Sequence, residues 1–168
     1  GGRIASFLLD KGDYDVTVSS RNPVSYPKLS GIKVVKVETH TNTLENFLEG
    51  FDAIIHLAAL DASKSGEFPI EAIDVNISDT LRWKIAANKA AVPKFIYFST
   101  IHVYGKQSVA SLNELSNINP VHPYAITHAS AEQFVLSPIF SEKSKGFVFR
   151  LSNSFGYPMT SISQWHLV

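Results

Sequence analysis

Cysteine is absent from the 168-residue sequence. This absence excludes a disulfide framework, a thiolate nucleophile and a cysteine-based zinc site, and no other metal site is expected. A cysteine-free chain fits a reducing compartment, so we expect a cytoplasmic protein.

An excess of charge and a long apolar run are also absent. Fifteen Lys and Arg residues balance fifteen Asp and Glu residues, whereas a dedicated nucleic-acid binder carries an excess of basic residues. No apolar stretch reaches the roughly 18 to 20 residues that cross a bilayer. We therefore expect no nucleic-acid partner and no insertion into a membrane.

The composition that is present predicts a globular protein. Hydrophobic residues make up 45% of the chain and charged residues 18%, so there is enough apolar material to bury a core. We expect one domain over residues 1–168.

Short apolar runs predict β-strands, and most of the segments between them have helical character. The predicted strands are residues 16–19, 33–37, 53–57, 95–99 and 147–151. The predicted helices are residues 3–11, 43–48, 70–90 and 124–135. Gly12 is placed to end the first helix, and Asn42 with Glu45 resembles a capping box at the start of the second. The alternation predicts a parallel α/β sheet, and the nearly continuous apolar strands indicate helices on both faces.

The sequence begins inside a helical pattern, at Gly1-Gly2-Arg3-Ile4, with no strand before it. In a doubly wound sheet, the first and central strand would then be missing from this chain. The alternative is a small α/β domain of about four or five strands that simply begins with a helix.

Two hydroxyl side chains predict a proton-transfer site. Thr100 follows the predicted strand at 95–99, and ligands of an open α/β sheet bind outside the carboxyl ends of its strands. Tyr124 begins the predicted helix at 124–135. A threonine hydroxyl can hydrogen-bond a substrate hydroxyl or carbonyl, and a phenol can donate or accept its proton. This pairing is typical of a nucleotide-dependent oxidoreductase.

Residues 98–105 read Phe-Ser-Thr-Ile-His-Val-Tyr-Gly, and Pro120-Val121-His122-Pro123-Tyr124 follows. With residues 52–59 and 147–158, these segments resemble the extended short-chain dehydrogenase/reductase family, in particular its NAD(P)-dependent nucleotide-sugar epimerases and dehydratases. The resemblance implies a Rossmann-like doubly wound parallel sheet that lacks its first strand and its C-terminal substrate lobe in this chain. It also implies hydride transfer with NAD(P), a nucleotide-sugar or other small hydroxyl or carbonyl substrate, and is compatible with a homodimer.

The resemblance assigns a set of cofactor-binding residues. They are Gly1, Arg21, Leu57, Ala58, Ala59, Asn76, Ser99, Tyr124 and His128. Gly1 matches the last glycine of a Gly-x-x-Gly-x-x-Gly turn, where a helix N-terminus faces the pyrophosphate. Small Ala58 and Ala59 let the backbone approach the cofactor, and Asn76 matches an asparagine in a helix near the active site. Arg21 stands at a strand end where an arginine accommodates the 2′-phosphate of NADP, so NADP is favoured over NAD.

The family pattern Tyr-x-x-x-Lys is not kept, because the chain reads Tyr124-Ala125-Ile126-Thr127-His128. A spacing of four puts both side chains on one helix face, so His128 stands where the lysine orients the nicotinamide ribose and lowers the tyrosine pKa. An imidazole, with an ordinary pKa of about 6.5, can do the first job better than the second. His56, within the predicted strand at 53–57, is expected to be a packed strand residue.

The resemblance implies three catalytic residues, Thr100, Tyr124 and His128, and two substrate contacts, Thr100 and Asn153, with Arg150 supporting the loop at Asn153. The expected function is NAD(P)-dependent epimerisation, dehydration or reduction of a nucleotide-sugar. Two alternatives stay open. Arg21 favours an NADPH-dependent carbonyl reductase of the dihydroflavonol-reductase type, and His128 favours a catalytically silent dinucleotide-binding regulatory protein.

Overall fold

The computed structural model describes residues 1–20, 32–39, 43–107 and 111–153. The chain divides into two compact units, Gly1–Leu44 and Glu45–Val168. The expectation of a single domain over residues 1–168 stays a prediction.

The first unit contains one helix and a pair of parallel strands. Helix α1 (Gly2–Lys11) ends where Gly12 adopts a φ of 75°, and the Gly12 N–H donates to the Leu9 carbonyl at 2.9 Å. The two strands are β1 (Thr17–Ser19) and β2 (Lys33–Val35), paired from Thr17 with Lys33. The predicted helix, its glycine stop and both strands are therefore confirmed, although each strand is shorter than predicted.

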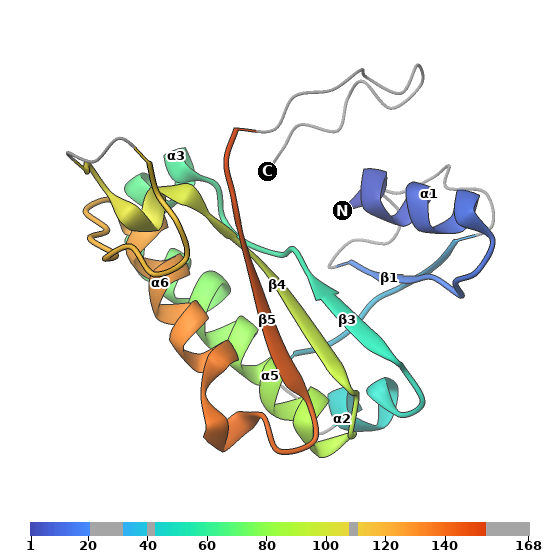
Figure 1. Cartoon of the computed structure of the whole chain (residues 1–168). Helices are drawn as coiled ribbons and strands as arrows, with labels where there is room; N and C mark the ends of the chain where they lie inside the picture. The colour runs from blue at the N-terminus through green and yellow to red at the C-terminus, as the bar shows by residue number, and fades with distance from the viewer. Residues whose placement is uncertain (21–31, 40–42, 108–110, 154–168) are drawn as a thin grey trace. The chain divides into compact units, whose positions relative to one another are not determined.

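The second unit is built on a parallel sheet in the order β3-β4-β5. Its strands are β3 (Ala53–His56), β4 (Lys94–Thr100) and β5 (Lys145–Leu151), with β4 in the middle (Figure 1). Because all three strands run in one direction, their carboxyl ends meet at one edge of the sheet. That edge is where Thr100 lies, as the last residue of β4.

Helices and short helical turns lead into these strands and connect them. They are α2 (Thr43–Leu48), α3 (Ala62–Glu67), α4 (Pro69–Ala72), η2 (Ile73–Asp79), α5 (Thr80–Lys89), η3 (Ile101–Tyr104), α6 (Pro123–Leu136) and η4 (Pro138–Phe140). The predicted helix at 70–90 is confirmed as the continuous run α4-η2-α5, but its middle is a π-helix, which the sequence analysis missed. Helix α3 and the two 3₁₀ turns were missed as well, because they are too short to show a period.

Both faces of the β3–β5 sheet carry apolar side chains. Helix α6 packs on β4 and β5, next to α5 (Figure 1), and Phe95 and Tyr97 of β4 are buried. Alternate residues of a strand point to opposite faces, so Phe98 lies on the other face, where its ring is 5.7 Å from that of Phe149 on β5. Apolar residues on both faces are typical of parallel sheets with helices on both sides. The chain therefore has the predicted Rossmann-like α/β class, and its described residues form two sheets with no strand in common.

Candidate active site

The strand-to-helix geometry brings the two predicted hydroxyl groups together. Thr100 is 5% exposed and begins the turn η3, where its Oγ1 accepts the N–H of His102 at 3.2 Å. Tyr124 lies in the first turn of α6, which starts with Pro123, and its N–H donates to Nδ1 of His122 at 3.2 Å. The two side chains lie close enough for Thr100 to lower the pKa of the Tyr124 phenol.

The ionisation of Tyr124 reflects three opposing influences. Burial raises the pKa of the phenol above its ordinary value, the nearby Thr100 side chain lowers it, and the charge of Asp61 raises it. Burial is the largest of these influences, so the pKa of Tyr124 is raised overall. Asp61 is held in place as the N-cap of α3, where its carboxylate accepts the N–H of Lys64 at 2.8 Å.

His128 lies against Tyr124, as the four-residue spacing predicts, with the ring centroids 4.2 Å apart. Its Nδ1 is 2.8 Å from the Tyr124 carbonyl oxygen, and because a carbonyl only accepts, Nδ1 carries the proton. The side chain is 2% exposed, and this burial lowers the pKa of His128. His128 is therefore neutral near pH 7 and supplies no fixed positive charge to the phenol.

Asn76 connects the loop after β3 to the start of α6. It lies in the π-helix η2 and is completely buried. Its Oδ1 accepts the Leu60 N–H at 2.7 Å, and its Nδ2 donates to Thr127 Oγ1 at 2.9 Å. Thr127 in turn donates to the Tyr124 carbonyl at 3.0 Å. Asn76 is thus near Tyr124, as the resemblance implied, and both ends of its amide are bonded within the protein; π-helical turns often mark functional sites.

His56 is a packed strand residue, as predicted. It is buried between the rings of Phe95 and Trp83, and its Nε2 lies 3.1 Å from Thr80 Oγ1. The Thr80 hydroxyl donates to the Asn76 carbonyl at 2.8 Å, so it accepts its second bond from the His56 Nε2–H. Burial lowers the pKa of His56 to about 4.

Four of the residues predicted to line the cofactor lie at the carboxyl ends of β3 and β4. Leu57, Ala58 and Ala59 follow β3 directly, and Ala58 is exposed. Ser99, on β4, is buried, and its hydroxyl has no hydrogen-bond partner. A buried hydroxyl without a partner next to small exposed residues fits a bound group that has polar atoms of its own.

Three predicted site residues stay untested at this site. Gly1 lies in the other unit, at the start of α1. Arg21 falls outside the described residues. Asn153 is exposed, two residues after the end of β5.

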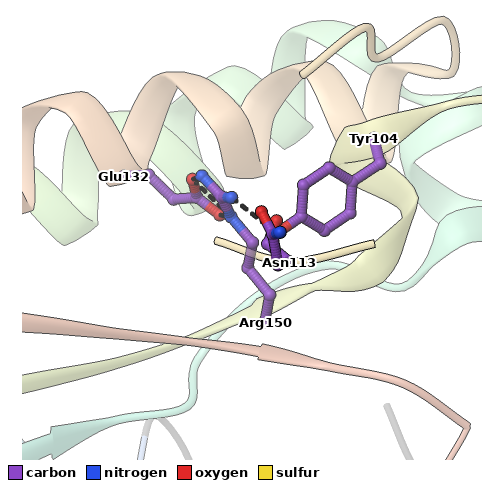
Figure 2. Close-up of polar contacts among 4 residues, drawn as sticks. All are labelled: Tyr104, Asn113, Glu132 and Arg150. Atoms are coloured by element: carbon purple, nitrogen blue, oxygen red, sulfur yellow. Dashed lines mark hydrogen bonds and ion pairs between the residues drawn. The ribbon is translucent and has the colours of Figure 1, made fainter. Parts of the chain in front are cut away.

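A polar cluster beside the site was missed by the sequence analysis. Figure 2 shows Arg150 of β5 bonded to Glu132 of α6 and to the hydroxyl of Tyr104, which also reaches Asn113. The four-residue spacing of Tyr124, His128 and Glu132 was the signal that could have placed Glu132 on the inward face of α6.

The part of the chain that the structure describes holds no group of three or more His, Asp and Glu side chains suited to a metal ion. None of its helices is long and apolar enough to cross a membrane.

The chain is similar to proteins of one family, and its relatives act on nucleotide-sugars by their names. The model of the NAD dependent epimerase/dehydratase family matches residues 1–164. The dTDP-D-glucose 4,6-dehydratase of Mus musculus is 34% identical over 154 residues, which cover 88% of this chain and 42% of that protein. The UDP-glucuronate 4-epimerase of Thermodesulfobacterium geofontis is 29% identical over 147 residues, which cover 79% of this chain and 46% of that protein. The chain thus spans less than half the length of these curated relatives.

Solved structures agree on the fold. The UDP-N-acetylglucosamine 4-epimerase from Methanobrevibacter ruminantium M1, in complex with UDP-N-acetylmuramic acid, is 30% identical with a TM-score of 0.70, covering 80% of this chain and 45% of that one. The UDP-glucuronic acid 4-epimerase from Bacillus cereus, in complex with UDP-glucuronic acid and NAD, is 23% identical with a TM-score of 0.74. The match covers 89% of this chain and 52% of that one. From the family match over nearly all its residues and the relative that shares a third of them, the chain belongs to the NAD dependent epimerase/dehydratase family.

Proposed function

We propose that this protein is an NAD(P)-dependent epimerase, dehydratase or reductase of a nucleotide-sugar. The observation that carries the proposal is the proximity of the Thr100 and Tyr124 side chains at the carboxyl end of β4. It pairs a group that can hold a substrate hydroxyl with a group that can take its proton. The relatives named above include enzymes whose names specify nucleotide-sugar substrates, which supports the same substrate class here.

Each residue of the site has a distinct role in this proposal. Thr100 forms a hydrogen bond with the reacting hydroxyl of the sugar, and Tyr124 removes the proton of that hydroxyl. Bound NAD(P) supplies the hydride acceptor and donor. In the reverse direction, Tyr124 returns a proton to a carbonyl oxygen while Thr100 orients it. Asn153, just after β5, is proposed as a second contact with the substrate.

The residues proposed to hold the cofactor fall into two groups. In the second unit they are Leu57, Ala58, Ala59, Ser99, Tyr124 and His128, with Asn76 acting through the bonds that orient its neighbours. In the first unit they are Gly1 at the start of α1 and Arg21. Arg21, with no carboxylate beside it, favours NADP over NAD. The homodimer and the cytoplasmic location expected from the sequence stay predictions.

A catalytically silent dinucleotide-binding protein is the second candidate, and the buried, neutral His128 favours it. Burial keeps the pKa of the Tyr124 phenol raised, although the influence of Thr100 lowers it in part. The carbonyl reductase alternative is carried by Arg21 alone.

Turnover assays separate these candidates. The protein encoded by the complete reading frame around these residues is tested with UDP-glucose, UDP-glucuronic acid and dTDP-glucose in the presence of NAD or NADP. Tyr124→Phe should lower turnover by at least about 100-fold, the usual contribution of a general acid or base. Tyr14→Phe removes a hydroxyl from an exposed tyrosine of the first unit and serves as the matched control.

Full turnover by Tyr124→Phe would show that this phenol is not the proton-transfer group. Cofactor binding without turnover of any nucleotide-sugar would favour the catalytically silent dinucleotide-binding protein over the enzyme. Cofactor choice is read from the same titrations: Arg21→Ala should weaken NADPH by about 1.5 to 3 kcal/mol, the range for a charge-assisted bond, and NADH little. Equal losses for both cofactors would contradict the assignment of Arg21.

A further inference from the structure

Four residues from four parts of the second unit form one hydrogen-bonded cluster, here called the Arg150 cluster: Tyr104, Asn113, Glu132 and Arg150 (Figure 2). The guanidinium of Arg150 donates from Nε to both carboxylate oxygens of Glu132 at 3.1 Å and from Nη2 to Oε2 at 2.7 Å. Its Nη1 donates to the Tyr104 hydroxyl at 2.8 Å. That hydroxyl donates its own proton to the Asn113 carbonyl at 2.9 Å.

The cluster joins the elements that carry the candidate active site. Tyr104 ends η3, four residues after Thr100. Glu132 lies on α6, eight residues after Tyr124 and therefore on the same helix face. Arg150 is the next-to-last residue of β5, three residues before Asn153. Each residue proposed to touch the substrate thus lies on, or directly next to, an element that carries a member of the cluster.

The segment at 111–119, which leads from η3 to α6, is tied to the same place. The Asn119 N–H donates to the Val103 carbonyl at 2.9 Å. Gln107 Nε2 donates to the carbonyls of Tyr104 and Asn117. Together with the bond from Tyr104 to Asn113, these contacts hold the middle and the end of the connection between Thr100 and Tyr124.

The chemistry of the cluster suits it to fix the positions of its residues more than to stabilise the fold. Glu132 is completely buried, and Arg150 is bonded through three of its nitrogens, an arrangement that the single ammonium of a lysine cannot reproduce. Its hydrogen bond with Glu132 raises the pKa of Arg150, so the guanidinium stays charged. Because a buried ion pair contributes little net stability against an apolar replacement, its use lies in fixing the relative positions of its partners.

We propose that the Arg150 cluster is a positioning device for the nucleotide-sugar. By fixing residues 111–119 and the end of β5 against α6, it sets the shape of the surface that the substrate meets beside Thr100 and Tyr124. Tyr104, Glu132 and Arg150 are positioning residues: they govern affinity for the nucleotide-sugar and leave both cofactor binding and proton transfer unchanged. This inference rests on the proposed function, since it assumes a nucleotide-sugar as the ligand.

The test measures binding of UDP-glucose and dTDP-glucose to the complete, NAD-loaded protein by calorimetry, with kcat at saturating substrate alongside. Tyr104→Phe removes one hydroxyl and keeps the ring, whose centroid lies 4.9 Å from the guanidinium carbon of Arg150. Both Tyr104→Phe and Glu132→Gln should weaken the tighter of the two nucleotide-sugars by about tenfold, which corresponds to about 1.4 kcal/mol. Affinity for NAD and kcat should match the unsubstituted protein.

Val92→Ala is the matched control for lost stability. Val92 is completely buried just before β4, at the other end of that strand from Thr100, so its truncation lowers the melting temperature without touching the cluster. It should leave nucleotide-sugar affinity unchanged. Unchanged affinity in Tyr104→Phe and Glu132→Gln, or an equal loss in Val92→Ala, would overturn the proposal, as would a protein that binds neither nucleotide-sugar. Nucleotide-sugar binding that the cluster variants weaken, but without turnover, would support the positioning device and refute only the proposed reaction.

Discussion

The proton affinity of a single phenol decides what the candidate site can do. Burial raises the pKa of Tyr124, and among its close neighbours Thr100 opposes that effect. His128 lies in ring contact with Tyr124, but burial keeps its imidazole neutral, and its proton is used by the backbone of its own helix. A residue that replaces the family's lysine therefore holds the helix together without activating the phenol.

His128→Lys should lower the pKa of Tyr124, because an ammonium on the same helix face stabilises the phenolate. Each unit by which that pKa falls corresponds to about 1.36 kcal/mol. In the pH–rate profile for oxidation of the nucleotide-sugar, the rate rises as the Tyr124 phenol loses its proton, so the midpoint of that rise should move to lower pH and activity near neutral pH should increase. His128→Gln, which can still donate to the Tyr124 carbonyl, is the neutral control. A midpoint that is the same in the Lys and Gln variants would contradict this reading of position 128.

Short elements with unusual backbone geometry position the site. The π-helix η2 places Asn76 between Leu60 and Thr127. The 3₁₀ turn η3 ends at Gly105, which has a φ of 62° and a ψ of −154°, a region that is essentially limited to glycine. A Cβ at Gly105 would lie 2.1 Å from the Asn119 carbonyl oxygen, so the turn and the end of the following connection pack backbone to backbone.

Gly105→Ala should therefore cost much more stability than Gly50→Ala. Both glycines have positive φ, but a Cβ at Gly50 has no atom within 4 Å. Gly50→Ala carries only the backbone cost of about 1 to 2 kcal/mol, whereas Gly105→Ala adds an overpacking cost of about 1 to 3 kcal/mol. Denaturant unfolding measures both. Equal losses at the two positions would show that residues 105 and 119 do not meet as closely as described.

Across the whole molecule, the core of the second unit is unusually polar. His56, Asn76, Thr80, Lys84, Thr127, His128 and Glu132 are all buried there. Lys84 donates from Nζ to the Ser144 carbonyl, and burial lowers its pKa to about 8. Buried groups that are neutral in the folded state bind protons more readily after unfolding, so the stability of the protein depends on pH.

Acid should destabilise the protein between pH 6.5 and about 4. Burial lowers the pKa of His56 to about 4 from its ordinary value of 6.5, so the unfolded chain binds the extra proton in that window. The stability is complete above pH 6.5 and is lost as the pH falls, by about 3 kcal/mol for His56 at about 1.36 kcal/mol per unit. His56→Gln keeps a donor toward Thr80 and should flatten this dependence in denaturant unfolding measured across pH. His102→Gln, at an exposed position, is the control. If the unfolding free energy of His56→Gln depends on pH as steeply as that of the unsubstituted protein, His56 is not the source of the dependence.

The elements of the fold could be predicted from the sequence because their signals are local. The apolar strand at 94–100, the helix that starts at Pro123 and the glycine that ends α1 are each encoded within a few residues. The same local signals identified Thr100 and Tyr124 as partners, because parallel strands end at one edge of a sheet. The π-helix was missed because its residues have the same composition as an ordinary helix.

By itself, the sequence determined the α/β class, the order of the elements, and the placement of Thr100, Tyr124 and His128 at one site. Only the tertiary structure decided which charges and hydrogen bonds that site has. The bond from Arg150 to Tyr104 joins residues 46 positions apart, and that from Asn76 to Thr127 joins residues 51 apart. No local pattern encodes such pairs, and burial, which keeps His128 neutral and raises the pKa of Tyr124, is a property of the packed chain and not of any segment of it.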